Sequence, residues 1–234
     1  MPVALVTGGS AGLGRALVHS LADDGWTVVT DARDPEALAA AVRGLDAVVP
    51  VAGDVADPAH RQALTREVEW LGRLDLLVHN ASTLGPLPLR PLRDVTERQL
   101  LDTWRTNAAA PAALTAQLLP RLTASAGTLV AITSDAAVEH YETWGAYAAG
   151  KAALEHLTLT TAAEEGVRAY VVDPGDLRTR MHQDAFPGED ISDRPEPESV
   201  VPALRALLAA APPSGRYRAA DYADRAGDLA GASR

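Results

Sequence analysis

Short apolar runs alternate with longer segments of helical periodicity along almost the whole sequence, and this alternation limits the fold more than any other feature. We expect strands at residues 3–7, 27–30, 47–51, 74–79, 128–133 and 169–173, with a weak seventh at 216–218. Helices are expected near residues 13–24, 35–43, 58–72, 94–121, 147–165 and 197–210. Strands this continuously apolar suit a parallel sheet that is covered on both faces. The pattern therefore predicts a doubly wound α/β fold of three layers, α/β/α, with a sheet of about seven strands.

Composition narrows the class of partner. The chain has 234 residues, a formal net charge of −10 at pH 7 and no Cys. Nucleic acids and anionic membranes require clustered positive charge, which an acidic chain lacks. Thiolate ligands are absent and the six His show no paired ligand spacing, so we expect no metal site. We predict a single domain over residues 1–234, without a signal peptide or membrane span and located in the cytoplasm, whose partners are small molecules or other subunits.

A glycine-rich stretch, VTGGSAGLG, joins the first predicted strand to the first predicted helix. Gly8, Gly12 and Gly14 permit a tight turn, and its backbone N–H groups can approach a pyrophosphate at the helix N-terminus, where the macrodipole favours an anion. Ser10 and Leu13 belong to the same turn. The position of the cluster between strand and helix favours a dinucleotide site, and an ordinary strand-to-helix turn is the alternative.

The only Lys of the chain, Lys151, follows Tyr147 by four residues, whereas Arg occurs twenty times. At this spacing the two side chains lie one turn apart on one face of a helix. A free tyrosine exchanges protons poorly at pH 7 because its pKa is about 10, and a nearby ammonium stabilises the phenolate. The compact charge of lysine suits such a site better than the broader guanidinium. The pair predicts an acid–base tyrosine with a lowered pKa, and an ordinary helix-surface pair is the alternative.

Taken in order, these motifs resemble the short-chain dehydrogenase/reductase family over residues 3–181. The resemblance depends on the TGxxxGxG spacing, on YAAGK, on Ser134 thirteen residues before Tyr147, and on Asn107 in WRTNAAAP. It implies a Rossmann-type sheet, a nicotinamide cofactor and reversible hydride transfer to or from a carbonyl or secondary alcohol, with Tyr147 as general acid or base. Ser134 would hold the substrate oxygen, Lys151 would touch the nicotinamide ribose, and the backbone at Asn107 would hold a water for proton relay.

The resemblance also implies the remaining cofactor contacts. Asp54 and Val55 would meet the adenine, and Thr179 would reach the carboxamide and the diphosphate. The full set expected to bind the cofactor is Gly8, Ser10, Gly12, Leu13, Gly14, Arg33, Asp54, Val55, Asn80, Ala81, Tyr147, Lys151, Pro174, Gly175, Leu177 and Thr179. The stretch HNAS fits the family only in part, since His79 and Ser82 stand where Asn and Gly are usual.

The residues after the second predicted strand bear on the choice between NAD(H) and NADP(H). A carboxylate there selects the ribose 2′-hydroxyl of NAD, whereas a 2′-phosphate needs a cation. The usual Asp position falls on Ala32, and the neighbouring Arg33 offers a planar fork of donors, so we favour NADP(H). Asp31 keeps NAD(H) open, because a shift of the strand end by one residue would bring its carboxylate to the ribose. Ala11 also lacks the basic side chain that NADP users of the family often have.

The substrate is expected to be a small carbonyl or alcohol, which the sequence does not identify. The candidate pocket residues, chosen by position, are Leu84, Asp135, Tyr141, Trp144, Met181, His182 and Phe186. Residues 186–199, rich in Pro and charge, predict a surface loop.

Other assignments stay open. The Ala-rich helices near 100–118 and 147–163 would pack on another subunit, as in the homodimers and homotetramers of the family, unless they form internal core. A dinucleotide-binding regulator without turnover is one alternative function. An NAD-dependent dehydrogenase or an epimerase of the same fold is another.

Overall fold

The computed structural model describes residues 1–224, so the end of the domain predicted over residues 1–234 lies outside the described residues. Seven strands form one parallel sheet in the order β3-β2-β1-β4-β5-β6-β7. Their bounds are β1 (Val3–Val6), β2 (Thr27–Ala32), β3 (Val48–Ala52), β4 (Leu76–His79), β5 (Thr128–Ile132), β6 (Arg168–Asp173) and β7 (Gly215–Arg218). The predicted Rossmann-type sheet, including its weak seventh strand, is confirmed. The strand order reverses between β1 and β4, and ligands bind at the carboxyl ends of the strands beside such a switch point.

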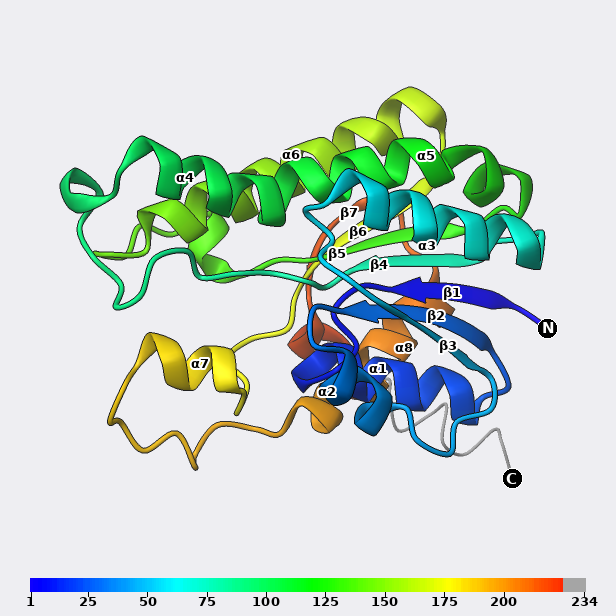
Figure 1. Ribbon diagram of the computed structural model, residues 1–234, viewed down its shortest axis with the longest axis horizontal. Coiled ribbons are helices and arrows are strands. Elements are labelled where there is room, and N and C mark those ends of the chain that lie inside the picture. The colour runs from blue at the N-terminus through cyan, green and yellow to red at the C-terminus, as the bar shows by residue number, and fades with distance from the viewer. Residues whose placement is uncertain (225–234) are drawn as a thin grey trace.

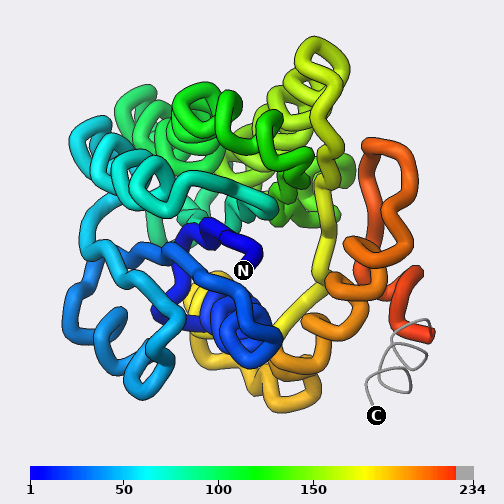
Figure 2. The backbone as a smooth tube through the Cα atoms, turned by 90° about the vertical axis from the view of Figure 1, so that its right-hand side faces the viewer, coloured from blue at the N-terminus to red at the C-terminus, as the bar shows by residue number. Residues whose placement is uncertain are grey.

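Helices cover both faces of the sheet (Figure 1). One face is covered by α1 (Gly12–Asp23), α2 (Pro35–Ala41) and α8 (Val201–Ala210), and the other by α3 (Pro58–Leu71), α5 (Ala110–Ala124) and α6 (Gly145–Glu165). Figure 2 shows α8 and β7, in orange to red, at one side of the molecule and β2, α2 and β3, in blue, at the opposite side. Within residues 1–224, no helix combines the length and apolarity needed to cross a membrane.

Two hydrophobic cores explain why the strands read as unbroken apolar runs. Successive side chains of a strand point to opposite faces of the sheet. Ala4 and Val6 of β1 therefore enter the core beneath α1 and α8, whereas Val3 and Leu5 enter the core beneath α3 and α5. Both faces of β1, β2, β4, β5 and β6 are buried along most of their length, so no polar alternation remains in these strands.

Two segments differ from the predicted elements. The helix expected over 94–121 is divided into α4 (Glu97–Trp104), a π-helical segment (Arg105–Ala109) and α5, after a 3-10 turn at Leu92–Asp94. A short helix, α7 (Arg180–Ala185), was not expected at all. The Thr179 hydroxyl begins it by accepting the His182 backbone N–H at 3.1 Å. After α7, residues 186–196 contain neither helix nor strand, as the predicted surface loop requires.

Candidate active site

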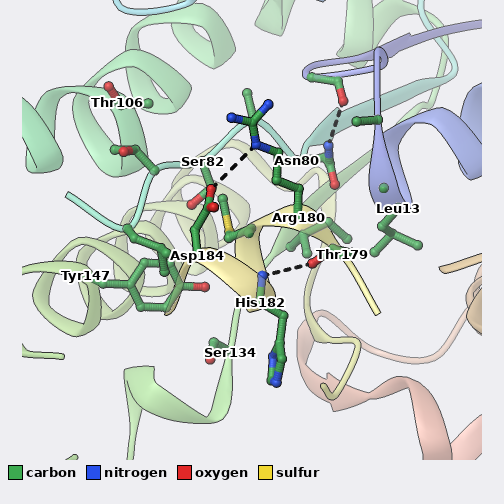
Figure 3. A pocket seen from close by; sticks show the side chains of 18 of the residues that line it. Leu13, Asn80, Ser82, Thr106, Ser134, Tyr147, Thr179, Arg180, His182 and Asp184 are labelled. Atoms are coloured by element: carbon green, nitrogen blue, oxygen red, sulfur yellow. Dashed lines mark hydrogen bonds and ion pairs between the residues drawn. The ribbon is translucent and has the colours of Figure 1, made fainter. Parts of the chain in front are cut away.

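A cavity of about 610 Å³ lies at the carboxyl ends of the strands, along the switch point. Figure 3 shows Leu13, Asn80, Ser134, Tyr147 and Thr179 around it. Every residue of the predicted cofactor set lines the cavity except Gly14. The turn after β1, the end of β2, the Asp54–Val55 segment and the turn after β6 thus meet in one place, although they are far apart in the sequence.

The glycine turn has the geometry of a phosphate cradle. A Cβ on Gly14 would lie 2.2 Å from the Gly8 carbonyl oxygen, so only glycine fits there. Asn80 holds the turn from the β4 side, because its side-chain amide donates to the carbonyls of Thr7 at 2.9 Å and Gly8 at 3.2 Å. Ala11, at the N-terminus of α1, provides no side-chain cap, so the first N–H groups of this helix stay open to an anion. These features fit the pyrophosphate of a dinucleotide.

Tyr147 and Lys151 lie on one face of α6 and both line the cavity. Their side chains are buried, with exposed fractions of 7% for Tyr147 and 2% for Lys151. The Lys151 ammonium donates to the Ile132 carbonyl at 2.8 Å and lies 5.6 Å from the centre of the Tyr147 ring. Ser134, two residues beyond the end of β5, lines the same cavity. Three of the four residues predicted to be catalytic, Ser134, Tyr147 and Lys151, are therefore brought together.

Burial determines the acid–base state of this pair. The pKa of Tyr147 is raised to about 12, mainly by burial; the Ser134 hydroxyl acts in the opposite direction, and nearby Asp135 acts in the same direction as burial. Burial lowers the pKa of Lys151 to about 8, against the opposing effect of Glu155. The predicted lowering of the tyrosine pKa is wrong for this structure, because burial disfavours the charged phenolate. At neutral pH the phenol keeps its proton.

Asn107 is buried within the π-helical segment and does not line the cavity. Its side chain pairs with the backbone of Thr83, donating to the carbonyl at 2.8 Å and accepting the N–H at 2.9 Å. A Cβ on Gly150 would lie 3.0 Å from the Asn107 Cβ, so α6 packs closely against the segment. Asn107 thus connects the catalytic helix to the chain that leaves β4.

The two departures from the family pattern fill structural positions. The Ser82 hydroxyl donates to the Asn107 side-chain oxygen at 3.2 Å. The buried ring of His79 pairs with the Thr115 hydroxyl at 2.7 Å. Burial lowers the pKa of His79 to about 3, so this ring is neutral at physiological pH.

Four of the predicted substrate residues line the cavity: Leu84, Trp144, Met181 and His182. Asp135, Tyr141 and Phe186 are not among its lining residues, and their place in the substrate pocket stays a prediction. The Asp135 carboxylate accepts hydrogen bonds from the Tyr141 hydroxyl at 2.8 Å and from the Ser134 hydroxyl at 2.9 Å. Phe186 lies behind the wall, with its ring centre 5.9 Å from that of Trp144.

Sequence reasoning missed part of the rim because it did not predict α7. Arg180 and Asp184 of this helix line the cavity and form an ion pair, with 3.7 Å between Nε and Oδ2 (Figure 3). Thr106, from the π-helical segment, also lines it.

An ionic network connects the last strand to the catalytic strand end, and it was also missed. Arg216 of β7 donates to Glu155 at 3.1 Å, to the Ser134 carbonyl at 3.2 Å and to Asp173 at 3.5 Å. The Thr133 hydroxyl donates to Glu155 at 2.6 Å. The pairing of β6 with β7 and the packing of α6 against β5 bring these residues together, so no local pattern in the sequence could indicate the network.

Comparison with known proteins agrees with this geometry. The sequence profile described as short chain dehydrogenase matches residues 2–190. The chain belongs to the short chain dehydrogenase family. Members of the family bind a nicotinamide cofactor, and the chain is an NAD(P)-dependent oxidoreductase of this family.

Individual relatives cover most of this short chain dehydrogenase. Benzil reductase ((S)-benzoin forming) of Saccharomyces cerevisiae is 33% identical over 196 residues, which cover 78% of this chain and 74% of the relative. Sepiapterin reductase of Mus musculus is 34% identical over 199 residues, with coverages of 77% and 76%. A solved short chain dehydrogenase of Shigella flexneri 2a, complexed with NADP, superposes with a TM-score of 0.86 at 29% identity, covering 93% of this chain and 96% of its own.

Proposed function

We propose that this enzyme is an NADP(H)-dependent carbonyl reductase in which Tyr147 donates a proton to the substrate oxygen. The observation that supports it best is the buried Tyr147–Lys151 pair beside Ser134 on the cavity wall. The phenol is protonated at neutral pH and can therefore donate its proton to the substrate oxygen. When bound, the nicotinamide cofactor supplies the hydride.

The other side chains of the site support this step. Ser134 can donate a hydrogen bond to the substrate oxygen and stabilise the charge that develops there. Lys151 has a pKa of about 8 and can therefore exchange a proton near neutral pH, so we assign to it the return of a proton to Tyr147. Through its two hydrogen bonds to the Thr83 backbone, Asn107 fixes the position of the chain after β4 relative to α6.

The preference for NADP(H) is supported by Arg33. Its guanidinium is exposed at the cavity, and within residues 1–224 it has no ion-pair or hydrogen-bond partner. A planar cation that is not neutralised by the protein suits a 2′-phosphate. A preference for NAD(H) remains the alternative outcome of the binding measurements below.

We propose a carbonyl substrate with a planar apolar group. The wall beside Tyr147 is formed by Leu84, Trp144 and Met181, and the Trp144 ring meets the Tyr147 ring edge-on at 5.5 Å. Such a wall suits a flat conjugated substituent. Two relatives are named for reducing benzil and sepiapterin, which agrees with this class.

The test is oxidation of NADPH and NADH by the purified protein, with aromatic ketones, diketones, aldehydes and quinones as acceptors. Tyr147→Phe is expected to reduce kcat by about 10²–10⁴-fold, because the general acid is lost. NADPH binding should stay close to that of the parent. Tyr217→Phe is the matched control, since this hydroxyl bonds the Pro213 carbonyl of the C-terminal region.

The alternatives give different results in the same assay. Tight NADPH binding with no turnover of any acceptor, and no effect of Tyr147→Phe, would identify a binding regulator. Product formation without net cofactor consumption would identify an epimerase.

We also propose that the enzyme forms a homodimer or homotetramer. Leu100, Leu101 and Trp104 of α4 and Leu157 of α6 are large apolar side chains exposed on two neighbouring helices. A second copy of the chain would bury them. A single domain over residues 1–234 and a cytoplasmic location remain predictions from the sequence.

A further inference from the structure

Asp31 is a buried carboxylate beside the adenosine end of the cavity. It lies in β2 next to Ala32 and lines the cavity, yet only 2% of it is exposed. One carboxylate oxygen accepts the Gly8 backbone N–H at 2.7 Å, and the other accepts from His60 Nε2 at 2.9 Å. Both oxygens therefore have partners within the protein.

His60 has little freedom to move away from Asp31. It lies in the first turn of α3 and is 7% exposed. A Cβ on Gly53 would lie 2.2 Å from His60 Nδ1, so the ring occupies the space that a side chain after β3 would need. With the proton on Nε2, the ring donates a hydrogen bond to the Asp31 carboxylate at 2.9 Å.

Near the adenosine end of the cavity, the carboxylates of Asp31, Asp34 and Asp54 all accept hydrogen bonds from other groups of the protein. Asp34 accepts two backbone N–H groups at the start of α2, and Asp54 accepts the Ala56 N–H at 2.8 Å. Asp31 is held by Gly8 and His60. Within residues 1–224, Arg33 is the charged side chain at this end of the cavity that has no ion-pair or hydrogen-bond partner.

We propose that His60 is a cofactor-specificity residue: by holding Asp31 against the Gly8 amide, it withdraws the carboxylate that would otherwise select the ribose 2′-hydroxyl of NAD(H). Among residues 1–224, Arg33 is then the charged group presented to the 2′-position. This inference rests on the proposed function. The inference goes beyond the proposed function because it assigns cofactor selection to His60, a side chain that does not itself contact the ribose.

The experiment measures the dissociation constants of NADPH and NADH from the enhancement of their fluorescence on binding, with no substrate present. Asp31→Asn keeps an acceptor for Gly8 and is expected to leave the NADPH-to-NADH ratio within about threefold of the parent. His60→Leu releases the carboxylate and is expected to shift the ratio towards NADH by about tenfold or more, the effect of one hydrogen bond to a charged acceptor. The double variant should return the ratio to the parent value.

His19→Leu is the matched control. The His19 ring pairs with the carbonyl of Ala41 at the end of α2, so this substitution should leave the NADPH-to-NADH ratio unchanged. A tenfold loss of NADH affinity in Asp31→Asn alone would mean that the carboxylate already contacts the ribose, and the inference would be overturned. The inference would also be overturned if His60→Leu folds and leaves the NADPH-to-NADH ratio unchanged. If His60→Leu does not fold, the NADPH-to-NADH ratio of Asp31→Asn alone tests the inference.

Failure of the proposed function gives a separate result. A parent protein that binds neither NADPH nor NADH contradicts the proposed reductase. A parent that binds both, with a ratio that responds to Asp31→Asn, contradicts only the role assigned to His60.

Discussion

Burial shifts the pKa values of Tyr147 and Lys151 in opposite directions, and each shift favours the neutral form. The phenol loses solvent and is harder to ionise, while the ammonium loses solvent and gives up its proton more easily. Spacing in the sequence predicted that the two residues share a helix face. It predicted the wrong direction for the shift of the tyrosine pKa, because the depth of burial depends on elements far along the chain.

The Lys151 shift makes stability depend on pH. The pKa of Lys151 is about 8 in the folded protein and 10.5 without burial, so between these values the unfolded chain binds a proton that the folded protein does not. The free energy of unfolding of the parent therefore rises with pH across this window. Relative to Lys151→Met, the parent should gain about 3 kcal/mol between pH 8 and 10.5, measured by urea titration at several pH values.

Tyr147 is present in both proteins, so its own destabilising effect above pH 10 cancels in the comparison. Parallel pH profiles for the parent and Lys151→Met would contradict a buried ammonium with a lowered pKa.

The π-helical segment shows how one side chain changes an element. Helical periodicity over 94–121 predicted one helix. A π-turn adds only one residue to the turn, which changes the periodic pattern too little to be recognised in the sequence. The Asn107 side chain occupies the bulge and completes the hydrogen bonds of Thr83. The Asn was singled out by resemblance, but its side-chain partners became known only from the structure.

Asn107→Ala is expected to destabilise the enzyme and to lower kcat. The N–H and the carbonyl of Thr83 both lose their partner, which costs roughly 2 kcal/mol of unfolding free energy, and the chain next to Ser82 loosens. Denaturant unfolding measures the first effect and steady-state kinetics the second. Gln117→Ala is the control, because its exposed bond to Thr65 should contribute less than about 0.5 kcal/mol. Equal effects of the two substitutions would contradict the role given to Asn107.

On the scale of the whole molecule, the exposed apolar side chains are unevenly distributed. Several lie on α4 and α6, whereas Trp70 stands alone on α3. Trp104→Glu should shift the oligomer to smaller species, because a charge would be buried in the subunit interface. Sedimentation velocity measures the mass of each species. Trp70→Glu is the matched control: Trp70 is 82% exposed and Trp104 is 43% exposed, yet only Trp104 lies on the proposed interface.

A monomeric parent, or an oligomer that survives Trp104→Glu unchanged, would contradict the assignment of this face. Kinetics of the smaller species would show whether α6, which contains Tyr147, keeps its activity without a partner subunit.

The sequence by itself determined what depends on neighbours along the chain. Alternating apolar runs specified the layered sheet, glycine spacing specified the phosphate turn, and the four-residue interval placed Tyr147 and Lys151 on one helix face. Tertiary structure alone decided which carboxylates are already bound, such as Asp31 by His60, and that Arg216 connects β7 to the Ser134 carbonyl. It also decided the direction of the tyrosine pKa shift. The physical reason is range: backbone geometry and helix spacing act over a few residues, whereas desolvation and charge pairing depend on groups that only the folded chain brings together.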